Sequence, residues 1–307
     1  MFDFFQKRPF ALHVTDKLIQ LMKVSGSLED PRVDFFIEKP LPVGVIIAGE
    51  IMKKDELRDK ILQMMEEAKI KNNADVVLTF DEAVCYENTF FYNGSIDEEA
   101  VVGFLYKKIG MMMPVASDRL KYDYIVYGLG DMKIIFMVAS KSALVSAYHD
   151  FLKKECNLNP IAFEPEILSL MRNISFPSNL NKGYLFILAH NNAINWYLME
   201  KGLIFDSNSA KLQNLSDALG DLQKSIKFFK DKTNQEVEKI LVTGSDLNQL
   251  EALKQLKIEM VNYNEYFIKP LTDDQKSIGL NFFIVGGAAL KKIKGLARKF
   301  EINLFKN

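Results

Sequence analysis

The sequence predicts an α/β protein built from more than one lobe, and three observations support this class. The stretch from Met132 to Arg172 reads as strand, helix, strand and helix without a gap, which is the pattern of an α/β unit. The chain has 307 residues, enough to bury a substantial core and to form two or more lobes. Hydrophobic residues make up 48% of it, which indicates a well-folded protein.

Each element of that stretch has a local signal. Met132 to Val138 is a β-rich apolar run, and apolar residues recur at helical spacing from Ser142 to Cys156. The segment Asn157 to Pro160 stops this helix, and Ile161 to Phe163 is a short second strand. Pro165 then stands in the first turn of the next helix, where its missing N–H costs nothing.

The composition excludes several classes of protein. With 39 basic and 40 acidic residues, the charge balance gives no reason to expect binding to nucleic acid. No apolar run approaches the roughly 20 residues that span a bilayer, and the first ten residues lack the apolar core of a signal peptide. Cys85 and Cys156 have no metal-ligand spacing, so we expect reduced thiols in a cytoplasm and no metal site.

The first third of the chain predicts a hairpin, a helix and a buried strand. Phe10 to Val14 and Leu18 to Val24 are apolar segments separated by a three-residue turn. Asp55 is placed to cap a helix with one apolar face, and Val76 to Phe80 reads as a buried strand.

From about Cys85 to Val138 the pattern changes to a separate small unit. Tyr86 to Tyr92 reads as a strand, and Ser95 begins a capping box ahead of an amphipathic helix. Two strands then flank the turn Gly128 to Asp131. Its Gly-x-Gly has no helix after it, so it does not predict a dinucleotide site.

A second lobe is expected from about Tyr184. Tyr184 to Leu188 and Ile194 to Met199 form a strand pair, and a long helix with a leucine-rich stripe follows. From Leu290 to Phe300 one side is apolar and the other carries Lys291, Lys292, Lys294, Arg298 and Lys299. This helix either packs on the core with a solvated basic face or lies on an anionic membrane.

Three segments together resemble the PilM family, cytoplasmic platform proteins of type IV pilus machines that are related to the cell-division protein FtsA. They are the stretch from Met132 to Arg172, the sequence FALHVTD near the start and KILVTGSD near the end. The resemblance implies a two-lobed actin-like ATPase fold, with related five-stranded sheets and a small inserted α+β (SHS2-like) subdomain in the first lobe. The implied divisions are 1–85 for the first-lobe core, 86–162 for the insertion, 163–183 for the return to the core, 184–285 for the second lobe, and 286–307 for a C-terminal helix and tail on the first lobe.

The resemblance also implies a nucleotide site, but this sequence departs from the family at its phosphate loops. The first loop would hold phosphate through Thr15, Asp16 and Lys17, and His13 stands where the family has an aspartate. In the second loop, Leu188 and His190 replace an aspartate and a glycine. The sequence therefore lacks the carboxylates by which such an ATPase holds Mg²⁺. A plain turn, with His13 as a core residue, is the alternative for the first loop.

Other family positions are retained in kind. Asp221 and Lys224 match an acid and a base that face adenine and ribose, and a solvated helix face explains them equally well. Thr243, Gly244 and Ser245 match the adenosine motif, with Ser245 in place of a glycine. Gly286 and Gly287 allow close approach of a nucleotide, or of the helix to the sheet.

The last residues resemble the I-N-L-L segment by which PilN is held in a groove of PilM, between the core lobe and the insertion. The matching residues are Ile302, Asn303, Leu304 and Phe305. Our hypothesis is that this tail occupies the same groove, in its own chain or a neighbour's, and so competes with the partner. A frayed, unattached terminus is the alternative.

The resemblance implies a scaffold at the inner face of the cytoplasmic membrane. It would bind the short N-terminal cytoplasmic peptide of a PilN-like membrane protein, together with pilus motor and platform components. Two alternatives stay open, an active actin-like ATPase and an FtsA-like membrane anchor. The altered phosphate loops favour a protein with no catalytic residues and disfavour ATP and Mg²⁺ as cofactors. Peripheral membrane association and self-association are left open.

Overall fold

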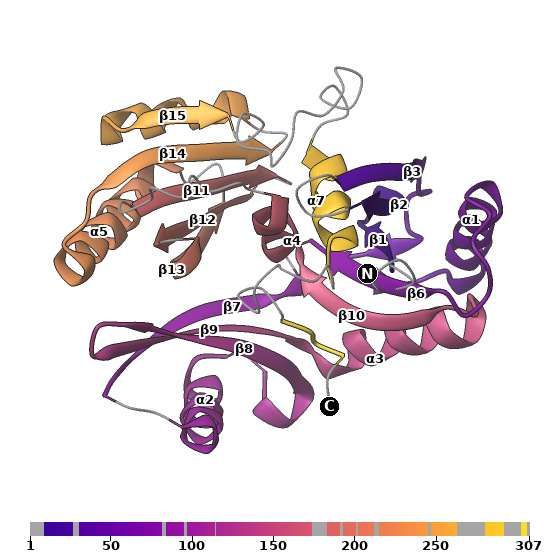
Figure 1. The fold of residues 1–307 in the computed structure, drawn as a ribbon, viewed down its shortest axis with the longest axis horizontal. Helices are drawn as coiled ribbons and strands as arrows, with labels where there is room; N and C mark the ends of the chain where they lie inside the picture. The colour runs from indigo at the N-terminus through magenta and orange to yellow at the C-terminus, as the bar shows by residue number, and fades with distance from the viewer. Residues whose placement is uncertain are drawn as a thin grey trace.

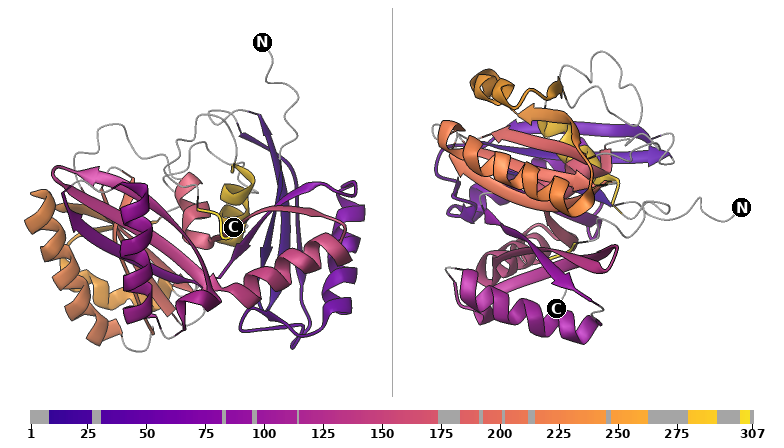
Figure 2. Two further views of the ribbon diagram at one scale, coloured as in Figure 1. Left: turned by 90° about the horizontal axis from the view of Figure 1, so that it is seen from below. Right: turned by 90° about the vertical axis from the view of Figure 1, so that its left-hand side faces the viewer.

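The computed structural model describes residues 9–26, 31–81, 84–94, 97–113, 115–173, 183–190, 193–200, 202–211, 215–244, 247–262, 280–291 and 302–305. They form two sheet-based lobes, side by side in the view of Figure 1, and a smaller unit that lies below the left-hand lobe in that view. Figure 2 shows the same arrangement from two further sides.

The first lobe is a five-stranded sheet with helices on both faces. Its strands are β1 (Phe10–Val14), β2 (Leu18–Gly26), β3 (Pro31–Pro40), β6 (Asp75–Phe80) and β10 (Asn159–Pro165), in the order β10-β6-β1-β2-β3. The first three form an antiparallel meander, and β6 and β10 run parallel to β1. β10 is therefore an edge strand, with one side of its backbone outside the sheet.

Four helices cover this sheet. They are α1 (Lys54–Glu67), α3 (Ser142–Asp150), α4 (Glu166–Asn173) and α7 (Leu280–Ala289). α4 and α7 pack together on one face, and α1 and α3 lie on the other (Figures 1 and 2). A small hairpin of β4 (Ile46–Ile47) and β5 (Glu50–Ile51) leads into α1.

The second lobe repeats the plan of the first. Its strands are β11 (Gly183–His190), β12 (Ala193–Glu200), β13 (Leu203–Lys211), β14 (Val237–Gly244) and β15 (Glu259–Asn262), in the order β13-β12-β11-β14-β15. Again three antiparallel strands precede two strands parallel to the first. Helix α5 (Leu215–Thr233) and a 3₁₀ stretch (Leu247–Leu256) complete the lobe. The predicted pair of related five-stranded sheets is confirmed.

The inserted unit is a three-stranded antiparallel sheet with one helix. β7 (Tyr86–Asn93), β8 (Leu120–Leu129) and β9 (Met132–Lys141) pair in the order β7-β9-β8, with α2 (Glu98–Met112) and a 3₁₀ turn (Ser117–Arg119) between β7 and β8. One face packs on α2. The other face contacts the second lobe, where the ring of Phe91 lies 5.1 Å from those of Phe205 and Phe228.

Three local expectations need correction. The carboxylate of Asp97 caps α2 by accepting from the backbone N–H of Ala100 at 2.7 Å, whereas the expected cap, Ser95, lies outside the described residues. α1 begins after Lys53 without a side-chain cap, and Asp55 lies in its first turn. The single helix expected up to Cys156 is α3 followed by a π-helical turn, Phe151–Glu155.

The lobes also divide the chain differently from the expected boundaries. The inserted sheet ends with β9, while α3 and β10 pack in the first lobe, so the boundary at residue 162 assigns core residues to the insertion. α7 begins inside the range 184–285 yet packs on β1, β2 and α4. No turn or change of composition separates β9 from α3 in the sequence, which explains the first difference.

Two findings concern membranes. Within the described ranges, no helix has the length and apolar character needed to cross a bilayer. The expected basic amphipathic helix falls mostly on residues 292–300, which lie outside the described residues. Lys291 is described, and it is buried rather than part of a solvated basic face.

Candidate functional site

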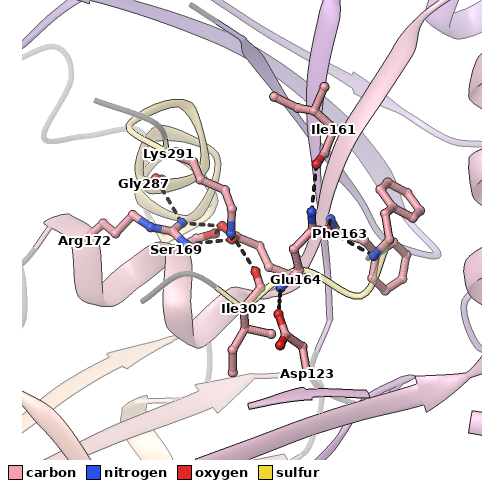
Figure 3. Close-up of polar contacts among 11 residues, drawn as sticks. Asp123, Ile161, Phe163, Glu164, Ser169, Arg172, Gly287, Lys291 and Ile302 are labelled. Carbon is pink, nitrogen blue, oxygen red and sulfur yellow. Dashed lines mark hydrogen bonds and ion pairs between the residues drawn. The ribbon is translucent and has the colours of Figure 1, made fainter. Parts of the chain in front are cut away.

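The four-residue segment Ile302–Phe305 lies between two strand edges, as Figure 3 shows. One is β10, the edge strand of the first lobe, and the other is β8, an edge strand of the inserted sheet. The backbone N–H of Leu304 donates to the carbonyl oxygen of Phe163 at 2.9 Å. The backbone N–H of Asn303 donates to the carboxylate of Asp123 at 2.8 Å. The segment therefore joins the first lobe to the insertion.

The side chain of Asn303 binds the edge of β10 in the way that a neighbouring peptide group would. Its Oδ1 accepts from the backbone N–H of Phe163 at 3.0 Å, and its Nδ2 donates to the carbonyl oxygen of Ile161 at 2.9 Å. Oδ1 also accepts from the backbone N–H of Phe305, which forms a turn over Leu304 and Phe305 inside the segment. An amide is needed here because one end must donate and the other must accept.

The apolar side chains of the segment are anchored as firmly as core residues. Ile302 is 0% exposed and Leu304 is 1% exposed, while Asn303 between them is half-buried. The ring of Phe305 lies 5.3 Å from the rings of Phe163 and His149. Burying an Ile or Leu side chain stabilises by about 1.5–3 kcal/mol, so these two residues supply most of the attachment.

A buried charged cluster lies directly behind the segment. The carboxylate of Glu164 accepts hydrogen bonds from the two terminal nitrogens of the Arg172 guanidinium, from Lys291 and, at 2.7 Å, from the hydroxyl of Ser169. Burial raises the pKa of Glu164, but the charges of Arg172 and Lys291 outweigh it and the net shift is downward. Lys291 also donates to the carbonyl oxygen of Ile302 at 2.7 Å. The segment is thus part of the cluster's hydrogen-bond network.

We call Asp123, Ile161, Phe163, Glu164 and Lys291 the tail-binding surface. Sequence reasoning identified the segment but none of these five residues. A signal for Glu164 was present, since a carboxylate inside the apolar segment Ile161–Pro165 requires a buried partner. Its partners come from positions 172 and 291, and no local pattern connects them.

The first expected phosphate loop is closed by its own contacts. The Thr15 hydroxyl accepts from the backbone N–H groups of Lys17 and Leu18 and donates to the carbonyl oxygen of Leu18. The Asp16 carboxylate accepts from the backbone N–H of Ala48 at 2.8 Å and of Gly49 at 3.1 Å. The backbone donors beside the turn therefore already hold an anion.

His13 is buried at the position where the family carries an acid. Its Nδ1 lies 2.9 Å from Oε1 of Gln20, and its Nε2 lies 2.8 Å from Oε1 of Glu166. Gln20 donates its Nε2 to Glu38, which orients its oxygen toward His13. Both ring nitrogens then face acceptors, an arrangement that favours the protonated ring. Burial lowers the pKa of His13, but Glu166 foremost, with Gln20 and Asp81, raises it above the ordinary value.

The second expected loop offers no carboxylate either. Leu188 is a buried residue within β11, paired with Asn195 on one side and Thr243 on the other. His190 is the last residue of β11. A histidine and a leucine stand where two acids would place Mg²⁺, so the residues present do not fit a metal–nucleotide complex of the expected kind.

The remaining expected nucleotide residues are used in packing or lie at the surface. Asp221 and Lys224 form an ion pair on α5 at 2.8 Å, with 61% and 80% of their side chains exposed. A side chain at Gly244 would place its Cβ 1.8 Å from the carbonyl oxygen of Ala189, so its close approach is to β11. Thr243 is buried at the end of β14, and Ser245 lies outside the described residues.

The two glycines of α7 are also accounted for by packing. Gly286 and Gly287 are buried where α7 meets α4, and the carbonyl oxygen of Gly287 accepts from Arg172 at 3.4 Å. Among the described residues, no group of three or more His, Cys, Asp or Glu side chains is placed to hold a metal ion.

The topology and the comparisons define the fold class. The chain is similar to a chain of the PilM-PilN type IV pilus biogenesis complex, with a TM-score of 0.74, 14% identity, and coverage of 94% of this chain and 99% of that one. It is also similar to the cytoplasmic domain of EpsL, an inner membrane component of the type II secretion system of Vibrio cholerae. That likeness has a TM-score of 0.53 and 12% identity, and covers 97% of this chain and 98% of that one.

Likeness to these structures at such low identity establishes the fold. No protein-family model matches the sequence, and no curated protein matches it. The predicted two-lobed actin-like α/β fold with an insertion in the first lobe is confirmed.

Proposed function

We propose that this protein is a non-enzymatic scaffold of the PilM type, serving a type IV pilus or a related inner-membrane secretion platform. Its role would be to hold a short extended cytoplasmic peptide of a PilN-like membrane protein and to connect it to the motor and platform components. The fold likeness to a chain of the PilM-PilN complex supports this reading, as does the likeness to the cytoplasmic domain of EpsL.

The observation that carries the proposal is the segment Ile302–Phe305 at the tail-binding surface. The surface pairs one edge of β10 with a side-chain amide and a backbone N–H, and it buries the aliphatic residues on either side of the asparagine. Addition of an extended peptide to an exposed strand edge is a general mode of peptide recognition. Main-chain hydrogen bonds supply affinity, and side-chain sites supply specificity.

The proposed location follows from the proposed partner. A peptide at the cytoplasmic end of a membrane protein would hold this chain at the inner face of the cytoplasmic membrane. Membrane association would then be peripheral and would depend on the partner.

The two other functions have weaker support. An active ATPase requires positioned cations and free backbone donors around the phosphates, whereas Asp16 already occupies the donors of Ala48 and Gly49 and His13 is paired with Glu166. An FtsA-like anchor would use the basic face of residues 290–300, and Lys291 is committed to Glu164 inside the protein.

The proposal is tested by recruitment of the protein to membranes. Lipid vesicles carry a synthetic peptide with Ile-Asn-Leu-Leu at its centre, anchored through its C-terminal end. Matched vesicles carry Ile-Asp-Leu-Leu. The protein of residues 1–307 is compared with a variant of the same length, Asn303→Ala with Leu304→Ala, which we call the tail variant.

We expect the tail variant to sediment with the asparagine vesicles and not with the aspartate vesicles. Equal recovery of the tail variant on both kinds of vesicle would show that the protein does not recognise the asparagine. No recovery of a folded tail variant on either would contradict the proposed function.

A further inference from the structure

We infer that the segment Ile302–Phe305 is an internal occupant of the tail-binding surface, and that a peptide from another molecule binds there only by replacing it. The incoming peptide would carry an asparagine between two aliphatic residues. This inference rests on the proposed function, because it concerns the regulation of the same surface.

The segment is attached to β10 as a bound peptide would be, and not as a strand of the sheet. Within the described part of the chain, its backbone makes a single hydrogen bond to the backbone of β10, from Leu304 to Phe163. The other edge groups of β10 are bound by the Asn303 side chain. A strand built into the sheet would continue its ladder over several residues, as β6 does on the other side of β10.

The tail-binding surface cannot be left empty without cost. If the segment left with nothing in its place, the Phe163 N–H and the Ile161 carbonyl would lose their partners on this side. Lys291, which is 7% exposed, would lose the Ile302 carbonyl oxygen. Strand edges and buried polar groups that have lost their hydrogen-bond partners favour the binding of a new partner. A second peptide with the same pattern restores each contact, so exchange is favoured over simple opening.

The covalent connection between Lys291 and Ile302 keeps the segment close to the tail-binding surface. Residues 292–301 connect Lys291, which is fixed in the cluster with Glu164, to Ile302. A short tether gives its end an effective concentration on the order of millimolar at a nearby site. A free peptide with an intrinsic dissociation constant of about 10 µM would therefore bind the intact protein about 100-fold more weakly than a protein whose own segment is released.

The test uses this chain's own segment as the probe. A fluorescein-labelled peptide with the sequence of residues 298–307 is titrated into the protein of residues 1–307, the tail variant and a control variant, Glu251→Gln. Glu251 is an exposed residue of the second lobe whose carboxylate pairs with Lys254. A second peptide, with aspartate in place of asparagine, measures specificity.

We expect the tail variant to bind the asparagine peptide at least tenfold more tightly than the wild type does, and the control variant to match the wild type. The aspartate peptide should bind none of the three. Equal affinity of the wild type and a folded tail variant would overturn the inference, as would absence of binding to a folded tail variant.

Two further measurements keep the inference testable. If the tail variant does not fold, the single variant Leu304→Ala provides the same comparison, and an unchanged affinity would overturn the inference. Sedimentation of the wild type shows whether the segment binds its own chain. A dimer that dissociates on adding the probe would place it on a neighbouring copy and overturn internal occupancy.

The inference and the proposed function fail separately. Binding of the probe to the tail variant, without recruitment of that variant to Ile-Asn-Leu-Leu vesicles, would overturn the proposed partner and leave exchange intact. Recruitment that is equal for the wild type and the tail variant would support the partner and overturn exchange.

Discussion

Replacing Glu164 by glutamine should destabilise the first lobe by about 3–5 kcal/mol, the usual cost of removing one member of a buried ion pair. The side chain is fully buried, and its two oxygens accept from Arg172, Lys291 and Ser169. Glutamine keeps the shape but removes the charge and turns one acceptor into a donor. Two buried cations then face an amide. Because Lys291 also binds Ile302, the tail should loosen as well.

The pH dependence of this effect has a definite sign. The pKa of Glu164 is lowered in the folded protein from its ordinary value of 4.5, so the carboxylate stabilises the fold above that value and the contribution is lost as the pH falls through the folded pKa. The difference between wild type and Glu164→Gln should therefore be constant near neutral pH and should shrink in acid.

Two measurements check this prediction. Urea unfolding followed by circular dichroism gives the loss of stability, and hydrogen exchange of the Leu304 amide gives the loosening of the tail. The exposed control Glu251→Gln should change neither. A loss below about 1 kcal/mol, in the range of a surface ion pair, or an unchanged Leu304 amide would refute the argument that the cluster supports the tail.

The remaining predictions concern the residues expected at a nucleotide site. Fluorescent ATP and ADP should show no Mg²⁺-dependent binding at millimolar concentration, and tight Mg²⁺-dependent binding would return the ATPase to consideration. The pKa of His13 is raised above 6.5, so its pairing stabilises the fold below that pH and is lost as the pH rises through the folded pKa. The alkaline fall in melting temperature should therefore be weaker in His13→Gln, and an equal fall would contradict this assignment. Gly244→Ala should prevent folding or lower the melting temperature sharply, because its Cβ would meet the Ala189 backbone at 1.8 Å. The control Gly220→Ala, with open space around it in α5, should stabilise by about 0.5–1 kcal/mol, and similar melting temperatures for the two variants would show that the contact at Gly244 is relieved.

The features that the sequence predicted well are those with a short-range signal. Apolar alternation and turn residues located the hairpin β1–β2 and the strand pair β11–β12, and the proline at position 165 located the start of α4. Helix starts were less certain, because Ser95 and Asp97 are both good caps and only the structure distinguishes them. The related plan of the two sheets came from the family resemblance rather than from the residues.

The contacts of the candidate site were out of reach because they join residues far apart in the chain. Asp16 was expected at a phosphate, and it binds backbone groups more than thirty positions later, at Ala48 and Gly49. Lys291 was assigned to a solvated face by helical periodicity, and its partner Glu164 lies on β10. Helical periodicity predicts on which face of a helix a residue lies, but it does not predict which charged residue of another element lies opposite that face.

The ring contacts between the inserted sheet and the second lobe have a mechanical consequence. Phe91 of β7 packs against Phe205 and Phe228, while the chain on either side of the insertion continues into the first lobe. The insertion therefore acts as a cross-brace between the lobes. Any hinge motion that changed the angle between the lobes would have to slide or separate these aromatic rings, so their packing opposes such a motion.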